Sequence, residues 1–177
     1  SLRTAAQEYN ADAANATAIY GPISSWGVSA ITSMHQLFYN LGDFNANISA
    51  WNTSGVTDMS DMFRYASAFN QPLSLDTSSV TTMEAMFYFT SAFNQPLSLD
   101  TSSVTSMGLM FYATPAFNQP LSLDTSSVTN MGLMFEVRVP SATLQPDASL
   151  NCLRLRHPHS LPQRIRPFGL AEHLVSV

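Results

Sequence analysis

The sequence predicts an α/β repeat fold: a right-handed solenoid in which each coil of 24–25 residues contains one short strand and one short helix. Three observations support this prediction. The segment FNQPLSLDTSSVT occurs at Phe69, Phe93 and Phe117, with a period of 24 residues. Two looser copies precede it, over 20–43 and 44–68. Apolar and turn-forming residues recur at fixed positions of every copy, so each copy is expected to form one coil.

The first half of a coil has the pattern of a strand followed by a turn. In the copy that begins at Phe69, Leu73 and Leu75 flank Ser74. This alternation is typical of a short strand with both leucines facing the core. The Asp-Thr-Ser-Ser that follows carries short oxygen-bearing side chains, which bond their own backbone in turns.

The second half of a coil has the pattern of a short helix. Met83, Met86 and Phe87 fall at i, i+3 and i+4, on one helical face. Thr81 is the expected N-cap, and Glu84, three residues later, would complete a capping box. The corresponding threonines of the other coils are Thr32, Thr57, Thr105 and Thr129.

Apolar columns predict a continuous core. One coil cannot bury its apolar face alone, so the coils must stack. All nine methionines fall in two of these columns. Core packing explains them better than copper binding does, because thioethers fill irregular gaps. Three columns that run through all five copies are Met34, Met59, Met83, Met107 and Met131; Phe38, Phe63, Phe87, Phe111 and Phe135; and Ile31, Val56, Val80, Val104 and Val128.

The chain divides into three segments. Residues 1–19 are expected to form a capping helix, since Leu2, Ala5 and Tyr9 lie on one helical face. Residues 20–137 form the solenoid of about five repeats. Residues 138–177 contain five prolines and no repeat column. We expect this tail to be largely irregular or disordered, with a short helix near 169–175, and interpret it as a foreign or mis-spliced extension.

Composition excludes several classes of protein. Charged residues make up 11% of the chain, and the net charge is −5. This balance gives no basic footprint for nucleic acid. We find no apolar stretch as long as a membrane span and no signal-peptide pattern in the first residues, which is also what a secreted precursor trimmed to this start would show. Cys152 is the single cysteine, so no intrachain disulfide is possible.

Two polar columns are the candidate ligand-facing positions. Stacking would bring successive aspartates to about 4.8 Å, the strand spacing. At that separation carboxylates raise one another's pKa or bridge a cation, although the simpler interpretation is that they form turns. The adjoining hydroxyl-rich strip would face a glycan or ordered water, but it lacks the T-x-T pattern of an ice-binding face. The columns are Asp76, Asp100 and Asp124, and Thr77, Thr101 and Thr125.

The sequence predicts no catalytic, cofactor-binding or metal-binding residues. Cys152, His157, His159 and His173 match no zinc spacing. No G-x-S-x-G, H-E-x-x-H, phosphate-loop or dinucleotide pattern occurs. His35 has no acidic or nucleophilic neighbour that the sequence reveals. A near-perfect repeat also works against the unique constellation that an enzyme needs.

The copy over 44–68 resembles a known family. Its residues from Phe44 to Phe63 follow the pattern F-N-x-x-I-S-x-W-x-T-S-x-V-T-x-M-x-x-M-F. This pattern is similar to that of BspA-type leucine-rich-repeat surface proteins, which share their repeat with mycoplasma-type surface lipoproteins. The resemblance covers about 2–137. Later copies depart from it where Leu75, Leu99 and Leu123 stand in the tryptophan column.

The resemblance implies a leucine-rich-repeat-like solenoid at the cell surface or outside the cell. It implies a binding or adhesion module that presents an extended face to a protein or glycan ligand, with no catalytic residues to carry over. The alternative is a structural or vestigial fragment of a longer repeat array with no ligand of its own. The oligomeric state stays open.

Overall fold

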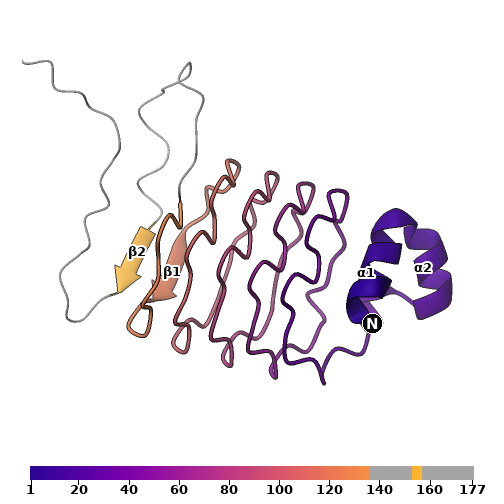
Figure 1. Cartoon of the computed structure of the whole chain (residues 1–177), viewed down its shortest axis with the longest axis horizontal. Helices are drawn as coiled ribbons and strands as arrows, with labels where there is room; N and C mark the ends of the chain where they lie inside the picture. Colours follow the sequence, from indigo (N-terminus) through magenta and orange to yellow (C-terminus); the bar gives the residue numbers. More distant parts are fainter. Residues whose placement is uncertain (136–152, 157–177) are drawn as a thin grey trace, which may run out of the picture.

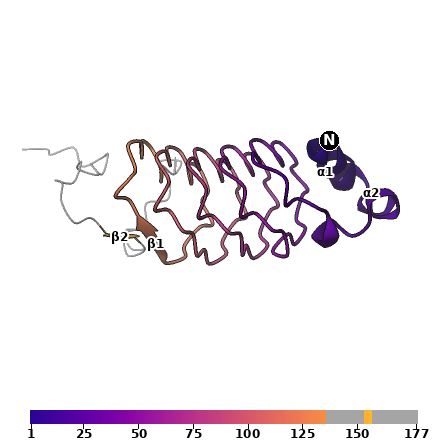
Figure 2. The same cartoon turned by 90° about the horizontal axis from the view of Figure 1, so that it is seen from below.

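The structure, a computed structural model, describes residues 1–135 and 153–156. Two N-terminal helices are followed by a row of stacked coils (Figures 1 and 2). The regular elements are α1 (Leu2–Ala11), α2 (Ala13–Tyr20), the one-turn helix η1 (Ile23–Ser25), β1 (Leu121–Asp124) and β2 (Leu153–Arg156). The remaining described backbone consists of turns, bends, isolated bridges and irregular segments. The fold therefore contains little regular secondary structure despite its repetition.

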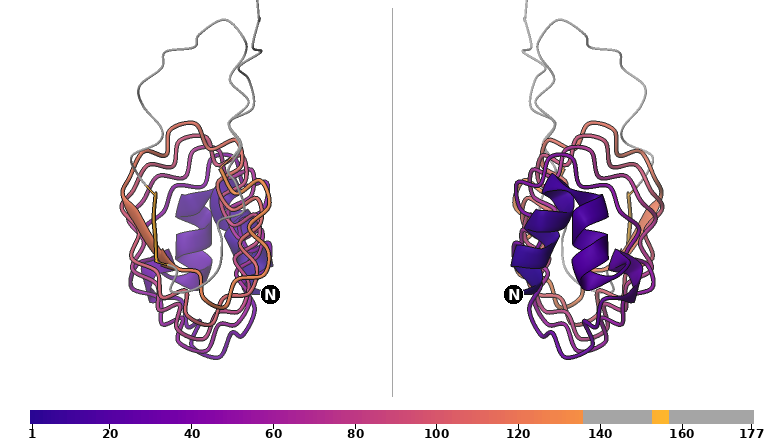
Figure 3. Two further views of the ribbon diagram at one scale, coloured as in Figure 1. Left: turned by 90° about the vertical axis from the view of Figure 1, so that its left-hand side faces the viewer. Right: turned by 90° about the vertical axis from the view of Figure 1, so that its right-hand side faces the viewer.

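The N-terminal cap consists of two helices, where the sequence predicted one over 1–19. Asp12 is extended, with φ −153°, and ends α1. Its carboxylate accepts the N–H of Asn15 at 2.9 Å and caps α2. This capping bond explains the break, because aspartate competes well for exposed N–H groups at a helix start. Figure 3 shows both helices lying across the end of the coil stack, and their buried residues are Ala5, Ala6 and Ala16.

Successive coils are joined by parallel backbone contacts. Isolated bridges link Ser33 to Asp58, Asp58 to Thr82, Thr82 to Ser106 and Ser106 to Asn130, each 24 or 25 residues further along the chain. Seen down the stack, the outlines of the coils nearly superimpose (Figure 3). The repeat period is therefore the length of one coil.

The short helix predicted for each coil is wrong for the described coils, which form successive turns instead. In the segment where the helix was predicted, every second backbone N–H donates to a carbonyl of the next coil. The N–H of Ala85 bonds the Gly108 carbonyl at 2.8 Å, and that of Phe87 bonds the Met110 carbonyl at 2.9 Å. The N–H groups between them close turns within the coil, as Met86 does to Met83 at 3.2 Å. Two turns in succession also produce the i, i+3, i+4 apolar spacing.

These turns need a left-handed residue at two positions of a coil. Non-glycine residues fill those positions, although side chains other than Asn and Asp resist this conformation. The bonds to neighbouring coils hold the strained backbone in place. The left-handed residues are Gln36, Asn40, Asp61, Tyr65, Ala85, Phe89, Leu109, Ala113 and Leu133, with φ between 51° and 61°.

Strands are also rarer than predicted. Among the described L-S-L-D segments, only Leu121–Asp124 has regular strand geometry, as β1. It pairs in parallel with β2, which places Leu121 opposite Leu153 and Asp124 opposite Arg156. For the tail over 138–177, predicted to be largely irregular, the structure thus describes one strand. The rest of the tail, including the helix expected near 169–175, lies outside the described residues.

Two phenylalanine ladders form the centre of the core. Along the first, Phe63, Phe87 and Phe111 stack at 5.5 and 5.4 Å between ring centroids. Along the second, Phe69 and Phe93 stack at 5.9 Å. The ladders contact each other within each coil, at 4.1 to 4.4 Å in the later described coils. Eight of the nine methionines are buried beside them and Met131 is partly buried. The predicted apolar columns are therefore confirmed as core, except at the last described position, where Phe135 is 39% exposed.

A threonine ladder joins the coils where helix N-caps were predicted. The N–H of Thr105 donates to the Thr81 carbonyl at 2.8 Å, and its hydroxyl donates to the same oxygen at 3.1 Å. Thr57, Thr81 and Thr129 repeat both bonds with the preceding coil. The expected capping role is therefore wrong, because the hydroxyls serve the contact between coils.

Replacing Thr105 with alanine is expected to lower the free energy of unfolding by about 1 kcal/mol or less. The variant loses the hydroxyl bond to Thr81 but keeps the backbone bond. Urea denaturation measures the change. Thr105→Ser keeps the hydroxyl and should recover part of the loss, whereas equal losses in the two variants would show that the hydroxyl bond contributes nothing.

Candidate functional site

The aspartate column is exposed, and each carboxylate is held by its own turn. Asp100 accepts the N–H of Ser102 at 3.0 Å and its hydroxyl at 2.7 Å, and Asp76 does the same with Ser78. Both bonds lower the pKa of these two carboxyls, and the bond from the serine hydroxyl has the larger effect. Asp76 and Asp124 act on Asp100 in the opposite direction but more weakly. The raised pKa considered for this column is therefore wrong, and the turn-forming interpretation accounts for the geometry.

Replacing Ser102 with alanine is expected to raise the pKa of Asp100 toward its ordinary value. The hydroxyl of Ser102 is the largest cause of the lowered pKa. Because folding holds this pKa below its unfolded value, ionised Asp100 stabilises the fold above the ordinary carboxyl pKa. That contribution disappears as the pH falls through the lowered pKa. An NMR titration of the carboxyl carbon measures the shift, and Ser103→Ala is the control that should leave it unchanged.

The threonine column lies inside the stack. Thr77 and Thr101 are 2% and 1% exposed. Their hydroxyls donate to the backbone carbonyls of Asp100 and Asp124 in the next coil, at 3.0 and 2.8 Å. Thr125 is equally buried. The ligand-facing assignment of these threonines is therefore wrong, because all three are buried and closed to a ligand on the outer face. The hydroxyls of Thr77 and Thr101 are satisfied by the coil contact, whereas that of Thr125 has no partner within the described residues.

His35 has polar neighbours that the sequence did not reveal. Its Nδ1 lies 2.8 Å from the hydroxyl of Ser60, which is itself 2.6 Å from the carboxylate of Asp58. An ionised carboxylate only accepts, so the serine proton points to Asp58. Nδ1 then carries the proton that His35 shares with Ser60. The histidine cannot take the serine proton in this arrangement, so the three residues form a hydrogen-bond chain rather than an activated nucleophile.

An asparagine–glutamine ladder was also missed from sequence. The side-chain oxygen of Asn94 accepts the N–H of Asn118 at 2.9 Å and the side-chain amide of Gln119 at 3.0 Å. Asn70 holds Asn94 and Gln95 in the same way. The recurring F-N-Q triplet was the sequence signal for this ladder, because an Asn-Gln pair that repeats in every later copy can bond the same pair in the next coil.

A row of aromatic side chains crosses the outer surface of four coils. Its members follow the first phenylalanine ladder by one or two positions. Tyr39 contacts Tyr65 edge-on at 6.0 Å between ring centroids. Tyr88 contacts Tyr65 edge-on at 5.6 Å and stacks on Tyr112 at 5.0 Å. We call this row the aromatic strip, and it consists of Tyr39, Arg64, Tyr65, Tyr88, Phe89 and Tyr112.

Arg64 is the charged centre of the aromatic strip. Its guanidinium carbon lies 4.5 Å from the ring centroid of Tyr88 and 5.3 Å from that of Tyr65, within cation–π range. One of its nitrogens lies 3.0 Å from the Asp61 carboxylate. Burial opposes the charge of Arg64, but the hydrogen bond to Asp61 and its other polar contacts outweigh it and raise the pKa. The strip thus presents partly exposed rings around a guanidinium that stays charged.

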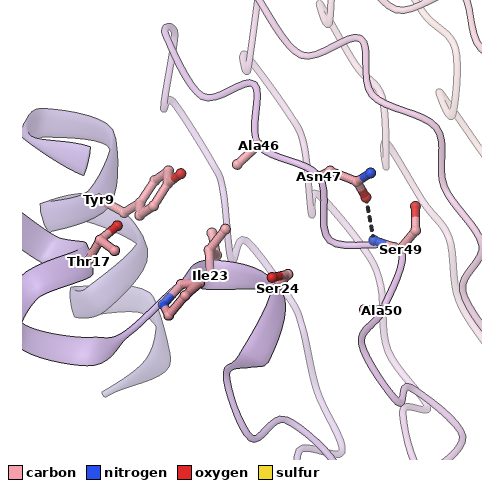
Figure 4. Close-up of a pocket in the computed structure, with 9 residues that line it drawn as sticks. Tyr9, Thr17, Ile23, Ser24, Ala46, Asn47, Ser49 and Ala50 are labelled. Atoms are coloured by element: carbon pink, nitrogen blue, oxygen red, sulfur yellow. Dashed lines mark hydrogen bonds between the residues drawn. The ribbon is translucent and has the colours of Figure 1, made fainter. Parts of the chain in front are cut away.

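A hollow of about 740 Å³ lies between the helical cap and the first coils. Figure 4 shows Tyr9 and Thr17 on the helical side, with Asn47 and Ser49 facing them from a coil. The ring of Tyr9 packs edge-on against Trp26, at 6.0 Å between centroids. None of the residues that line the hollow is charged: they are Tyr9, Thr17, Pro22, Ile23, Ser24, Ala46, Asn47, Ser49 and Ala50.

Comparison with known proteins gives one match. Residues 7–99 and 98–141 match the family described as Mycoplasma protein of unknown function, DUF285. That family is related to leucine-rich and BspA-type repeats. No curated protein and no solved structure is significantly similar to the chain.

The described residues give two further findings. None of their helices has the length and apolar character needed to cross a membrane. Within the same part of the chain, no three His, Cys, Asp or Glu side chains are placed to hold a metal ion.

Proposed function

This chain belongs to the family described as Mycoplasma protein of unknown function, DUF285, and on that premise we propose that it is a BspA-type leucine-rich-repeat solenoid that binds a macromolecule. We place it at the cell surface or outside the cell, and we assign it binding rather than catalysis. The stack of coils supports this proposal, because it offers a long outer surface of fixed geometry.

The aromatic strip is the observation that carries the proposal. Tyrosine and arginine dominate the energetics of protein interfaces, because each combines a large contact area with a polar group. Here Tyr65, Tyr88 and Arg64 contact one another and are only partly buried. Phe89 is 39% exposed beside them. A partner that covered the strip would bury these side chains with little loss of conformational freedom, since the neighbouring coils already hold them.

The arrangement of the rings favours a protein over a glycan at this strip. Tyr88 and Tyr112 are nearly parallel, with 9° between their planes, so each covers one face of the other. Arg64 lies over a face of Tyr88 as well. Sugars pack on free ring faces, whereas a protein also uses ring edges and hydroxyl groups. The ordinary pKa of a tyrosine hydroxyl, 10.0, already keeps it a donor at neutral pH, and burial raises the pKa of Tyr88 further in the same direction.

Binding to a panel of purified extracellular-matrix proteins tests the proposal, with a glycan array in parallel. We expect at least one matrix protein to bind, and Tyr88→Ala to weaken that binding about tenfold or more, the effect of removing an interface hot spot. Tyr20→Ala is the matched control, because Tyr20 is 43% exposed on the helical cap, away from the strip. Circular dichroism confirms that each variant is folded.

Two outcomes contradict the proposal. Folded protein that binds no matrix protein would favour the alternative, a structural fragment of a longer array. Equal weakening by Tyr20→Ala and Tyr88→Ala would place the interface elsewhere.

A further inference from the structure

The hollow beside the helical cap is open to solvent and has room for a small molecule. Its volume of about 740 Å³ lies within the range of ligand pockets, roughly 300–1,000 Å³. Its walls come from three parts of the fold: the helices that carry Tyr9 and Thr17, the segment 22–24 at the start of η1, and the coil that carries Ala46 to Ala50. The aromatic strip includes none of its lining residues.

Three polar groups that line this hollow make no hydrogen bond to the described part of the chain: the hydroxyl of Tyr9, the hydroxyl of Ser24 and the amide NH₂ of Asn47. Tyr9 is partly buried, and Ser24 and Asn47 are exposed, so all three groups are accessible to a ligand from solvent. The other half of the Asn47 amide is occupied, because its oxygen accepts the N–H of Ser49 at 2.9 Å. That bond fixes the direction of the free NH₂ group, just as the contact with Trp26 holds the ring of Tyr9.

The chemistry of these groups selects one class of ligand. Hydroxyl and amide groups donate and accept without charge, and a tyrosine ring packs against apolar C–H groups. Since no lining residue is charged, a carboxylate, phosphate or amine would lose hydration with no counter-ion to replace it. Ile23, 6% exposed, adds an apolar surface. We propose that this hollow is a binding site for a neutral saccharide unit.

Saturation-transfer NMR with the whole 177-residue chain tests this proposal. The probes are methyl α-mannoside, methyl β-galactoside and N-acetylglucosamine, with glucuronate and glucosamine as charged counterparts. We expect saturation transfer to at least one neutral sugar and to neither charged one. Tyr9→Phe and Asn47→Ala should each weaken that sugar's binding about three- to tenfold, the effect of one lost hydrogen bond.

Asn52→Ala is the matched control for Asn47→Ala. The Asn52 oxygen accepts the N–H of Ser54 at 3.2 Å in the same kind of turn, but Asn52 does not line the hollow. This variant should bind sugar like the wild type, and so should Tyr88→Ala, which separates the hollow from the aromatic strip. The proposal is overturned by equal weakening in Asn47→Ala and Asn52→Ala, by unchanged binding in Tyr9→Phe and Asn47→Ala, or by no transfer to any neutral sugar.

Discussion

Replacing Met107 with aspartate is expected to lower the free energy of unfolding by about 3–5 kcal/mol, the penalty for an unpaired buried charge. Met107 is fully buried, with 0% exposure. It stands between Met83 and Met131 in the methionine column, and its N–H is already bonded to the Asn130 carbonyl. Aspartate would find no cation there. A loss of this size is a large part of the stability of an ordinary domain, so urea denaturation should show a strongly lowered midpoint.

Leu133→Asp is the control for this substitution. Leu133 is 58% exposed and left-handed, with φ 54°. Aspartate accepts that conformation better than leucine does, and Asp61 occupies the corresponding position of an earlier coil. We expect a change of at most about 0.5 kcal/mol. If Met107→Asp is as stable as Leu133→Asp, the methionine column does not lie in the core.

Replacing Phe87 with alanine is expected to cost about 3–5 kcal/mol, the usual range for a buried phenylalanine. Phe87 is completely buried and contacts Phe63 at 5.5 Å, Phe111 at 5.4 Å and Phe93 at 4.2 Å between ring centroids. The variant would interrupt the first phenylalanine ladder and leave a cavity against the second. Thermal or urea denaturation measures the loss.

Phe89→Ala provides the comparison two residues away. Phe89 is 39% exposed and belongs to the aromatic strip. Its loss should cost about 1 kcal/mol or less in stability, because few of its contacts are buried. It should nevertheless weaken the proposed protein binding. Similar losses of stability in Phe87→Ala and Phe89→Ala would show that the ladder at Phe87 is not the centre of the core.

The sequence was sufficient for the features that depend on burial. A column such as Met59, Met83 and Met107 recurs because each coil buries the same position against the next. The period of 24 residues therefore indicated both the coil length and the core residues. The alternation of Leu121 and Leu123 with exposed neighbours was also predictable, and it is the segment that forms β1.

The helix and the threonine N-caps were predicted wrongly because hydrogen bonds between coils determine the backbone there. The spacing of Met83, Met86 and Phe87 fits a helix and a pair of turns equally well. Positions with a left-handed backbone are usually occupied by glycine and can then be recognised in a sequence, but here Ala85 and Phe89 occupy them. Sequence patterns within one coil do not reveal that a neighbouring coil supplies the hydrogen-bond acceptors.

The candidate sites were harder to predict for a related reason. The sequence around the threonine column is typical of an exposed turn, yet the Thr77 side chain points into the stack and donates to the carbonyl of Asp100. The aromatic strip follows a column of tyrosines, Tyr39, Tyr88 and Tyr112, that Arg64 interrupts, and the position after this column varies from coil to coil, so the repeat marked it only in part. The hollow needs Tyr9 and Asn47 together, and only the position of the helical cap over the first coils brings them close.

Scalar couplings across hydrogen bonds, measured by NMR between an amide nitrogen and the carbonyl carbon of its acceptor, test the stacked-coil account most directly. The account predicts a coupling from the Phe87 amide to the Met110 carbonyl and from the Ala85 amide to the Gly108 carbonyl. A helix in the same segment would instead couple the Phe87 amide to the Met83 carbonyl, four residues earlier. That second pattern would contradict the stack of turns.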